Sequence, residues 1–179
     1  MSDIETPNLI LRLVPLAGLA AIQREDIDAA RRIIGPSFTR EWFETAWVAG
    51  LRLQQWKDNL DYAPWSIRAI VSKESGDIVG NINCHDCPRI IEVSGQEGLM
   101  IEVGYTVFKP WRRRGIAVET TQGLANFAQK FGVRWIRLSI SPQNVASIGL
   151  AKKMGAYKIG SQIDDIDGPE DIYLLDIGK

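Results

Sequence analysis

The segment from residue 100 to residue 128 constrains the fold most, because it combines a strand, a basic turn that contains glycine, and a helix. Branched and aromatic residues at 99–108 predict the strand. Gly115 then allows a positive φ angle and a close approach of the backbone to a ligand. The apolar spacing over 115–131 predicts an amphipathic helix that ends at Gly132. A strand that leads through such a turn into a helix predicts an α/β protein.

The turn between this strand and this helix has the chemistry of a phosphate site. It carries three consecutive arginines, a glycine and a small residue two positions later: Arg112, Arg113, Arg114, Gly115 and Ala117. The first N–H groups of a helix have no intrahelical partners, and the helix dipole makes that end positive. Arginine also makes paired hydrogen bonds to phosphate oxygens. Short glycine motifs are weak evidence, however, and the same residues fit an ordinary solvated charge run.

The rest of the chain alternates predicted strands and helices. Further strands are expected at residues 9–14, 66–72, 77–84, 133–140, 157–162 and 171–177. Two short helices are expected over 16–34, meeting near residues 24–26, and another helix over 144–154. A further helix is expected after Thr39 as N-cap, with one stripe at helical spacing: Trp42, Phe43, Ala46, Trp47, Gly50, Leu51 and Gln54. Residues 85–98 show no clear periodicity. We expect one α/β domain over residues 1–179, with no repeat or linker.

Composition excludes several classes of protein. The chain of 179 residues has a net charge of −1, unlike the positive excess of a general nucleic-acid binder. Its two cysteines are too few for a disulfide framework. No stretch reaches the roughly 18–20 continuous apolar residues of a membrane span, and residues 1–8 do not resemble a secretory signal. We therefore expect a cytoplasmic protein with no nucleic-acid or membrane partner.

Several motifs in the right order resemble the GCN5-related N-acetyltransferase (GNAT) superfamily. The residues from Arg112 to Ala117 resemble the family's Arg/Gln-x-x-Gly-x-Gly/Ala signature, and residues 102–107 resemble the fourth strand that precedes it. Residues 133–138 resemble the fifth strand. Asn144 and Ser147 match the Asn-x-x-Ser element that opens the following helix. The motif style is most similar to acetyltransferases that act on ribosomal-protein N-termini.

The resemblance covers residues 99–160 well and residues 7–84 by element order only. It implies a central mixed, mostly antiparallel sheet of about six or seven strands flanked by helices. In this family the fourth and fifth strands splay apart, and the pantetheine arm of acetyl-CoA lies between them.

The resemblance also implies which residues bind acetyl-CoA. Backbone groups of Tyr105, Thr106 and Val107 would pair with the pantetheine arm as a strand does. The pyrophosphate would be held by backbone N–H groups of the turn, which are those of Arg112, Arg113, Arg114, Gly115, Ile116 and Ala117. Asn144 would contact the arm and Ser147 would brace the same helix, although Asn144 also suits the role of an N-cap alone.

The implied reaction is direct transfer of an acetyl group to a primary amine, on a protein N-terminus or a small molecule. The amine must lose a proton, and the departing thiolate must be stabilised or protonated. Glu102 is the candidate base on an apolar strand, and its alternative is a carboxylate that faces solvent or pairs with an arginine. Ala151 stands where many relatives carry a tyrosine acid. Ser141 is the candidate for that role, with Ser139, Ser147 or an unassisted thiolate as alternatives.

Two other features leave alternatives open. Cys84, His85 and Cys87 suggest a metal site, but zinc normally needs a second ligand pair, and the chain has no other Cys or His. We expect no metal there. The segment is instead expected to be the end of a strand that runs into a loop, with His85 at the substrate mouth. Four of the six tryptophans precede residue 66, either as core or as an aromatic wall for an amine.

Two functions of different kinds fit these residues. The first is the N-acetyltransferase, with an amine acceptor as partner and the chain as a monomer or homodimer. The second is a non-catalytic acyl-CoA-binding or sensor module, which the absent tyrosine favours. Turnover with any amine separates the two. The identity of the acceptor and the acyl chain length are left open.

Overall fold

The computed structural model describes residues 2–166 and 168–178. Its elements, in chain order, are β1 (Ile4–Glu5), β2 (Leu9–Leu13), α1 (Leu16–Gln23), α2 (Ile27–Ile33), η1 (Arg40–Thr45), α3 (Ala46–Asp58), η2 (Leu60–Trp65), β3 (Arg68–Ser72), β4 (Ile78–Cys84), β5 (Arg89–Val93), β6 (Gln96–Val107), η3 (Lys109–Trp111), α4 (Ile116–Gln129), β7 (Val133–Ile140), α5 (Val145–Lys153), β8 (Tyr157–Asp164) and β9 (Gly168–Asp176). The elements labelled η are short 3₁₀ helices.

The strands form one mixed sheet in the order β1-β2-β3-β4-β6-β7-β9-β8, with β5 paired to β6. Within the described residues, β6 and β7 are the parallel pair and the other neighbours are antiparallel. The expected α/β class and the mostly antiparallel sheet are confirmed. The described chain contains nine strands rather than six or seven, because β1 and β5 were not predicted.

Strand β5 lies in the stretch that showed no clear periodicity. Its pairing with β6 runs from Arg89, opposite Met100, to Val93, opposite Gln96. The loop that connects the two strands therefore has two residues. Those residues, Ser94 and Gly95, have φ angles of 52° and 77°. Two consecutive positive φ angles are typical of the tight hairpin turn that matches strand twist. The Ser-Gly pair was the signal available in the sequence.

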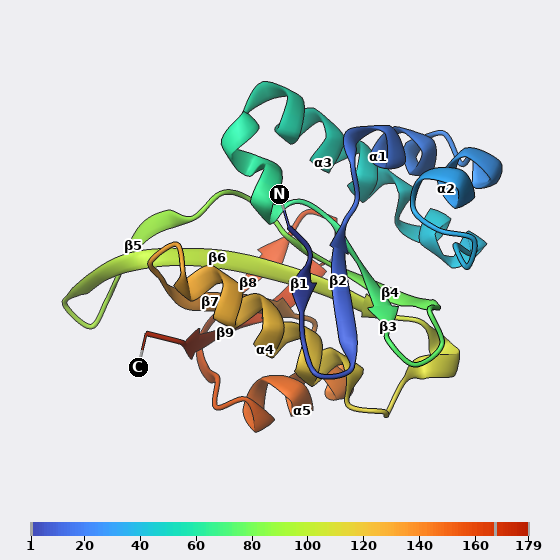
Figure 1. Ribbon diagram of the computed structural model, residues 1–179. Helices are drawn as coiled ribbons and strands as arrows, with labels where there is room; N and C mark the ends of the chain where they lie inside the picture. The colour runs from blue at the N-terminus through green and yellow to red at the C-terminus, as the bar shows by residue number, and fades with distance from the viewer. Residues whose placement is uncertain (1, 167, 179) are drawn as a thin grey trace.

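The sheet has a hydrophobic core on each face, and β3 contributes to both. Ile70 packs with Leu124 and Ala128 of α4, whereas Ala69 and Val71 pack with the helices α1, α2 and α3. This alternation follows from the two-residue period of a strand. Figure 1 shows α1, α2 and α3 grouped together, away from α4 and α5. Both faces of the central strands are therefore covered.

Helix boundaries mostly agree with the sequence pattern. The predicted break near residues 24–26 separates α1 from α2, and the Asp26 side chain caps α2 by accepting a hydrogen bond from the Ala29 N–H. Thr39 precedes the 3₁₀ helix η1 and makes no side-chain cap bond there. Among the described residues, no helix has both the length and the apolar character needed to span a membrane.

The face of α3 differs from the prediction. The expected stripe included Trp47 and Leu51, but these side chains are exposed, at 54% and 45%. The buried residues of α3 are instead Ala46, Ala49, Arg52 and Leu53. Ala46, Ala49 and Leu53 follow the helical period as well as Trp47 and Leu51 do, so periodicity alone does not choose between the two faces. The packing of α3 against the rest of the protein determines which face is buried.

Candidate active site

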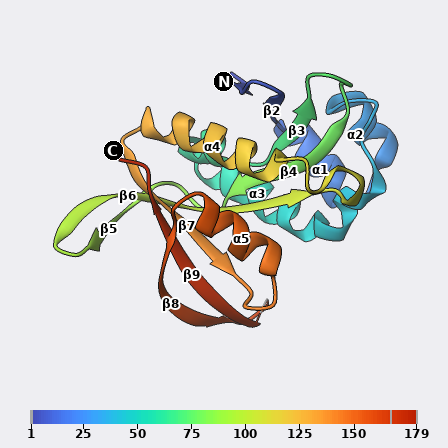
Figure 2. The ribbon, with the colours of Figure 1, turned by 90° about the horizontal axis from the view of Figure 1, so that it is seen from below.

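A cavity opens where β6 and β7 part. β6 pairs with β7 only from Leu99 to Glu102, and with β4 from Val103 onwards. Figure 2 shows β7 diverging from β6 beyond this point. The cavity has a volume of about 720 Å³, and its walls include Tyr105 and Thr106 of β6 and Ile140 of β7. The predicted splay between these two strands is confirmed.

The turn before α4 presents backbone rather than converging arginine side chains. Arg113 and Gly115 have φ angles of 61° and 79°, and Gly115 is the N-cap of α4, where no side chain caps the helix. The Arg112 Nε donates to the Val107 carbonyl at 2.9 Å, and the Arg114 guanidinium stacks over the Trp111 ring at 4.9 Å. Two of the three arginines therefore have protein partners. The N–H groups at the start of α4 are left as the anion-binding feature of the turn.

The start of α5 forms the second wall of the splay. Asn144 is its N-cap, and its side-chain oxygen accepts from the Ser147 N–H at 3.1 Å, as the N-cap interpretation predicts. The Tyr105 hydroxyl donates to the Ser147 Oγ at 3.0 Å, which links β6 to α5. Burial raises the pKa of Tyr105, and the bond to Ser147 opposes that shift. Ser141, just after β7, also lines the cavity.

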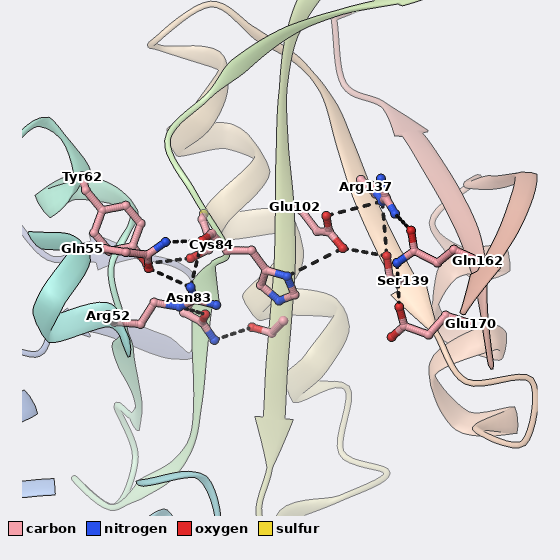
Figure 3. Close-up of polar contacts among 12 residues, drawn as sticks. Arg52, Gln55, Tyr62, Asn83, Cys84, Glu102, Arg137, Ser139, Gln162 and Glu170 are labelled. Carbon is pink, nitrogen blue, oxygen red and sulfur yellow. Dashed lines mark hydrogen bonds and ion pairs between the residues drawn. The ribbon is translucent and has the colours of Figure 1, made fainter. Parts of the chain in front are cut away.

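Glu102 lies at the last position of β6 that pairs with β7, among polar side chains rather than in an apolar setting. Its Oε1 accepts from the Ser139 hydroxyl at 2.6 Å and lies 3.6 Å from the His85 Nδ1, and its Oε2 lies 3.4 Å from the Arg137 Nε. Figure 3 shows Glu102, Ser139 and Arg137 facing one another across the two strands. The prediction of an apolar environment for Glu102 is wrong, because polar side chains surround the carboxylate. They are His85, just after β4, and Arg137 and Ser139 of β7. The alternative of an arginine pair is confirmed.

The network continues away from Glu102 toward the β8–β9 hairpin. The Arg137 guanidinium donates to the Gln162 Oε1 at 2.5 Å, and the Gln162 amide donates to Glu170 at 2.9 Å. Asp164 and Glu170 line the same cavity as His85 and Ser139. This side of the cavity is therefore acidic.

Helix α3 supplies the opposite wall. The exposed Trp47 and Leu51 line the cavity together with Arg52 and Gln55. Arg52 is only 5% exposed, and its guanidinium donates to the Asn83 side chain at 3.0 Å and to the His85 carbonyl at 2.8 Å. Burial lowers the pKa of Arg52. The sequence pattern missed Arg52, Gln55 and Asn83, although an arginine on the inward spacing of α3 was the available signal.

The segment from Cys84 to Cys87 is a strand end and a loop, as expected. Both cysteines are free, and burial raises the pKa of the Cys84 thiol to about 12. A metal would need the thiolate, which this burial disfavours. In the part of the chain that the structure describes, no three His, Cys, Asp or Glu side chains are grouped as metal ligands. His85 lines the cavity between β6 and β7.

We expect the two thiols to differ sharply in reactivity. Cys84 is fully buried and Cys87 is partly exposed, so a thiol reagent at pH 8 should modify Cys87 in the native protein and Cys84 only after unfolding. Mass spectrometry of quenched samples reads both sites. Equal labelling rates in native protein would contradict the burial of Cys84.

Comparison with protein families decides the assignment. The model of the acetyltransferase (GNAT) domain matches residues 8–157 of this chain. The chain belongs to the GNAT acetyltransferase family. This assignment favours an N-acetyltransferase over a binding module and accords with the resemblance seen in the sequence. A search of curated protein sequences finds no match.

Solved structures share the GNAT fold over the whole chain at low sequence identity. An acetyltransferase from Agrobacterium tumefaciens is 21% identical, with a TM-score of 0.63 and coverage of 98% of this chain and 94% of that one. A ribosomal-protein alanine acetyltransferase from Vibrio fischeri is 16% identical, with a TM-score of 0.61 and coverage of 98% and 97%. A ribosomal alpha-N-protein acetyltransferase in complex with coenzyme A is 14% identical, with a TM-score of 0.64 and coverage of 99% of both chains. At these identities the likeness concerns the fold alone.

Proposed function

We propose that this protein transfers an acetyl group from acetyl-CoA directly to a primary amine. The observation that carries the proposal is the cavity where β6 and β7 part, whose walls include Tyr105, Thr106 and Ser147 as well as Asp164 and Glu170. One cavity of this size can hold the reacting ends of the acetyl donor and of the acceptor, so that the two meet there. Direct transfer requires such a meeting, because no covalent enzyme intermediate carries the acetyl group.

The cofactor would occupy the splay and the turn. Tyr105, Thr106 and Val107 pair with β4 on one edge, and β7 has left their other edge, so backbone groups there suit the pantetheine arm. The pyrophosphate would bind the backbone from Arg112 to Ala117, with Arg113, Arg114, Gly115 and Ile116 between them. Asn144 and Ser147 would border the arm at the start of α5. A ribosomal acetyltransferase of the same fold has been solved in complex with coenzyme A, which supports coenzyme A as the kind of cofactor.

The acceptor would occupy the side between α3 and the β8–β9 hairpin. Asp164 and Glu170 line this side and favour an ammonium group, whereas Trp47 and Leu51 offer an apolar wall. The neighbours of the same fold include enzymes named for ribosomal-protein acetylation, which supports a protein N-terminus among the candidate acceptors. A small primary amine has the same reacting group.

Two side chains of the site have roles in this proposal. Glu102 belongs to the machinery that removes a proton from the amine, because it is the anionic centre of the cluster between β6 and β7. Ser141 lines the cavity and provides a hydroxyl for the departing thiolate. The position of the family's usual tyrosine is Ala151, which is fully buried and supplies no acid.

Turnover tests the proposal. The protein is incubated with acetyl-CoA and a panel of primary amines that includes polyamines, aromatic amines and peptides with free N-termini. We expect release of free thiol that requires both the protein and an amine, with an acetylated product by mass spectrometry. A folded protein that binds acetyl-CoA but acetylates no member of the panel would instead favour a sensor module.

Replacement of Glu102 should separate chemistry from cofactor binding. In Glu102→Gln, we expect kcat/KM for the amine to fall about 10–100-fold, because the anionic centre is lost while the amide still accepts from Ser139. The dissociation constant of acetyl-CoA should change less than about twofold. Glu97→Gln is the matched control, since Glu97 is exposed on the same strand. Equal kcat/KM in both variants would remove Glu102 from the mechanism.

We place the protein in the cytoplasm, because both cysteines are free thiols as in reducing compartments. We also propose that residues 1–179 act as one domain, as a monomer or homodimer.

A further inference from the structure

Glu102 is set back from the cavity, and two other residues stand between it and the acceptor. The cavity walls include His85 and Ser139, both of which contact Glu102, but not Glu102 itself. The Glu102 side chain is 18% exposed, whereas that of His85 is 45% exposed. A group that takes a proton from the amine must come within hydrogen-bond reach of it. The group that takes this proton must therefore line the cavity.

The backbone of His85 is held from two elements. Its N–H donates to the Glu102 carbonyl at 2.8 Å. Its carbonyl accepts from the Arg52 guanidinium at 2.8 Å and from the Gln55 amide at 2.9 Å. Figure 3 shows Arg52 and Gln55 reaching across from α3 toward the end of β4, where Asn83 and Cys84 lie. Both backbone polar groups of this first loop residue are thus hydrogen-bonded.

The imidazole of His85 lies between the Glu102 carboxylate and the backbone of Gly104. Its Nδ1 is 3.6 Å from the Glu102 Oε1, which is an ion-pair distance. Its Nε2 lies over Gly104, where an added Cβ would be only 2.9 Å away. Gly104 and His85 both line the cavity, so this glycine leaves room for the ring at the wall. One nitrogen faces the carboxylate and the other lies against Gly104, a residue of the cavity wall.

The charged groups around the ring come from three elements. Glu102 faces it from β6, and Arg137 of β7 lies behind Glu102. Arg52 of α3 binds the His85 carbonyl, and Asp86 follows in the chain. The Ser139 hydroxyl donates a hydrogen bond to the Glu102 carboxylate, so its proton is already engaged. The imidazole is the side chain that ordinarily changes charge between pH 5 and 8.

We propose that His85 is the catalytic residue that takes the proton from the acceptor amine, and that Glu102, Arg52 and Gln55 are positioning residues for it. This inference rests on the proposed acetyl transfer. The His85 Nε2 accepts one proton from the ammonium group. The amine nitrogen then bonds to the thioester carbonyl carbon, and the C–S bond breaks with its electron pair on sulfur. A second amine proton ends on the sulfur, which leaves one on the amide, and the imidazolium returns its proton to solvent.

The first test needs no acceptor, because His85 is the only histidine of the chain. In protein free of a histidine tag, the imidazole C–H signals are followed by NMR from pH 5 to 9, in the parent and in Glu102→Gln. We expect one titration whose midpoint falls by at least about half a pH unit in the variant, because the carboxylate favours the imidazolium. An unchanged midpoint would overturn the proposed pairing, whether or not an acceptor is known.

The second test uses kinetics with an amine that the parent acetylates. In His85→Gln, we expect kcat/KM to fall about 100-fold or more at pH 7 and to recover toward the parent at high pH, where the amine is already neutral. The dissociation constant of acetyl-CoA should not change. Asp86→Asn is the control on the same loop. Added imidazole should restore part of the activity of His85→Ala, which loss of structure alone would not allow.

The outcomes distinguish the two proposals. A His85→Gln variant with parental kcat/KM at every pH would overturn the role of His85 and leave acetyl transfer intact. A parent protein that acetylates no amine would overturn the proposed function itself.

Discussion

Gly115→Glu is expected to abolish acetyl-CoA binding while the protein remains folded. Gly115 is the N-cap of α4 with a φ angle of 79°, and an added Cβ would meet no atom within 4 Å. The substitution therefore costs backbone strain of roughly 1–2 kcal/mol but no clash inside the protein. A carboxylate would stand where the proposed pyrophosphate binds. Repulsion of several kcal/mol corresponds to a loss of affinity of about 100-fold or more.

Gly95→Glu is the matched control for this variant. Gly95 has a φ angle of 77°, and its added Cβ also meets nothing within 4 Å. It directly precedes β6, whereas Gly115 lies beyond the other end of that strand, at the start of α4. Calorimetry should show that Gly95→Glu binds acetyl-CoA with the same affinity as the parent protein. Tight binding to Gly115→Glu would show that the pyrophosphate binds elsewhere.

Gly80→Ala should distort the strand that carries the cofactor arm. Gly80 of β4 lies opposite Val107 of β6, and an added Cβ would be 2.1 Å from the Thr106 carbonyl oxygen. Backbone atoms cannot rotate away as a side chain can, so β4 and β6 must separate. We expect a loss of stability of about 3 kcal/mol or more, which lowers Tm by roughly 6–12 °C. Affinity for acetyl-CoA should fall with it, because Thr106 belongs to the proposed arm site.

Gly149→Ala controls for the loss of a glycine. An added Cβ there meets nothing within 4 Å, and Gly149 lies inside α5, where alanine is favoured over glycine by about 0.5–1 kcal/mol. Thermal unfolding should therefore show a small rise in Tm for Gly149→Ala and a large fall for Gly80→Ala. Parental stability of Gly80→Ala would contradict the close approach of β4 and β6.

The sequence predicts best where function depends on consecutive residues. The turn from Arg112 to Ala117 and the Asn144 cap lie where their motifs place them, since local backbone geometry determines both. The motif did not reveal that Arg112 binds the Val107 carbonyl or that Arg114 stacks on Trp111. These side chains are long, and nearby protein groups compete for them.

Features that depend on distant residues were the ones missed. The surroundings of Glu102 come from His85 and Ser139, which lie 17 and 37 positions away along the chain. No local period in the sequence of β6 carries information about such partners. Arg52 was missed for a related reason, because its buried position depends on acceptors at the end of β4. Packing between elements, rather than propensity within them, decides these contacts.

Thermal unfolding with and without excess acetyl-CoA tests the central claim, that the cavity between β6 and β7 is an acetyl-CoA site. At about 100 times its dissociation constant, a ligand stabilises the native state by about 2.7 kcal/mol, which raises Tm by roughly 5–11 °C for a protein of this size. NAD and ATP, which also carry adenine and a pyrophosphate group, are the controls. We predict a rise with acetyl-CoA and little change with either control. No rise with acetyl-CoA in a folded protein, or an equal rise with all three ligands, would contradict the account.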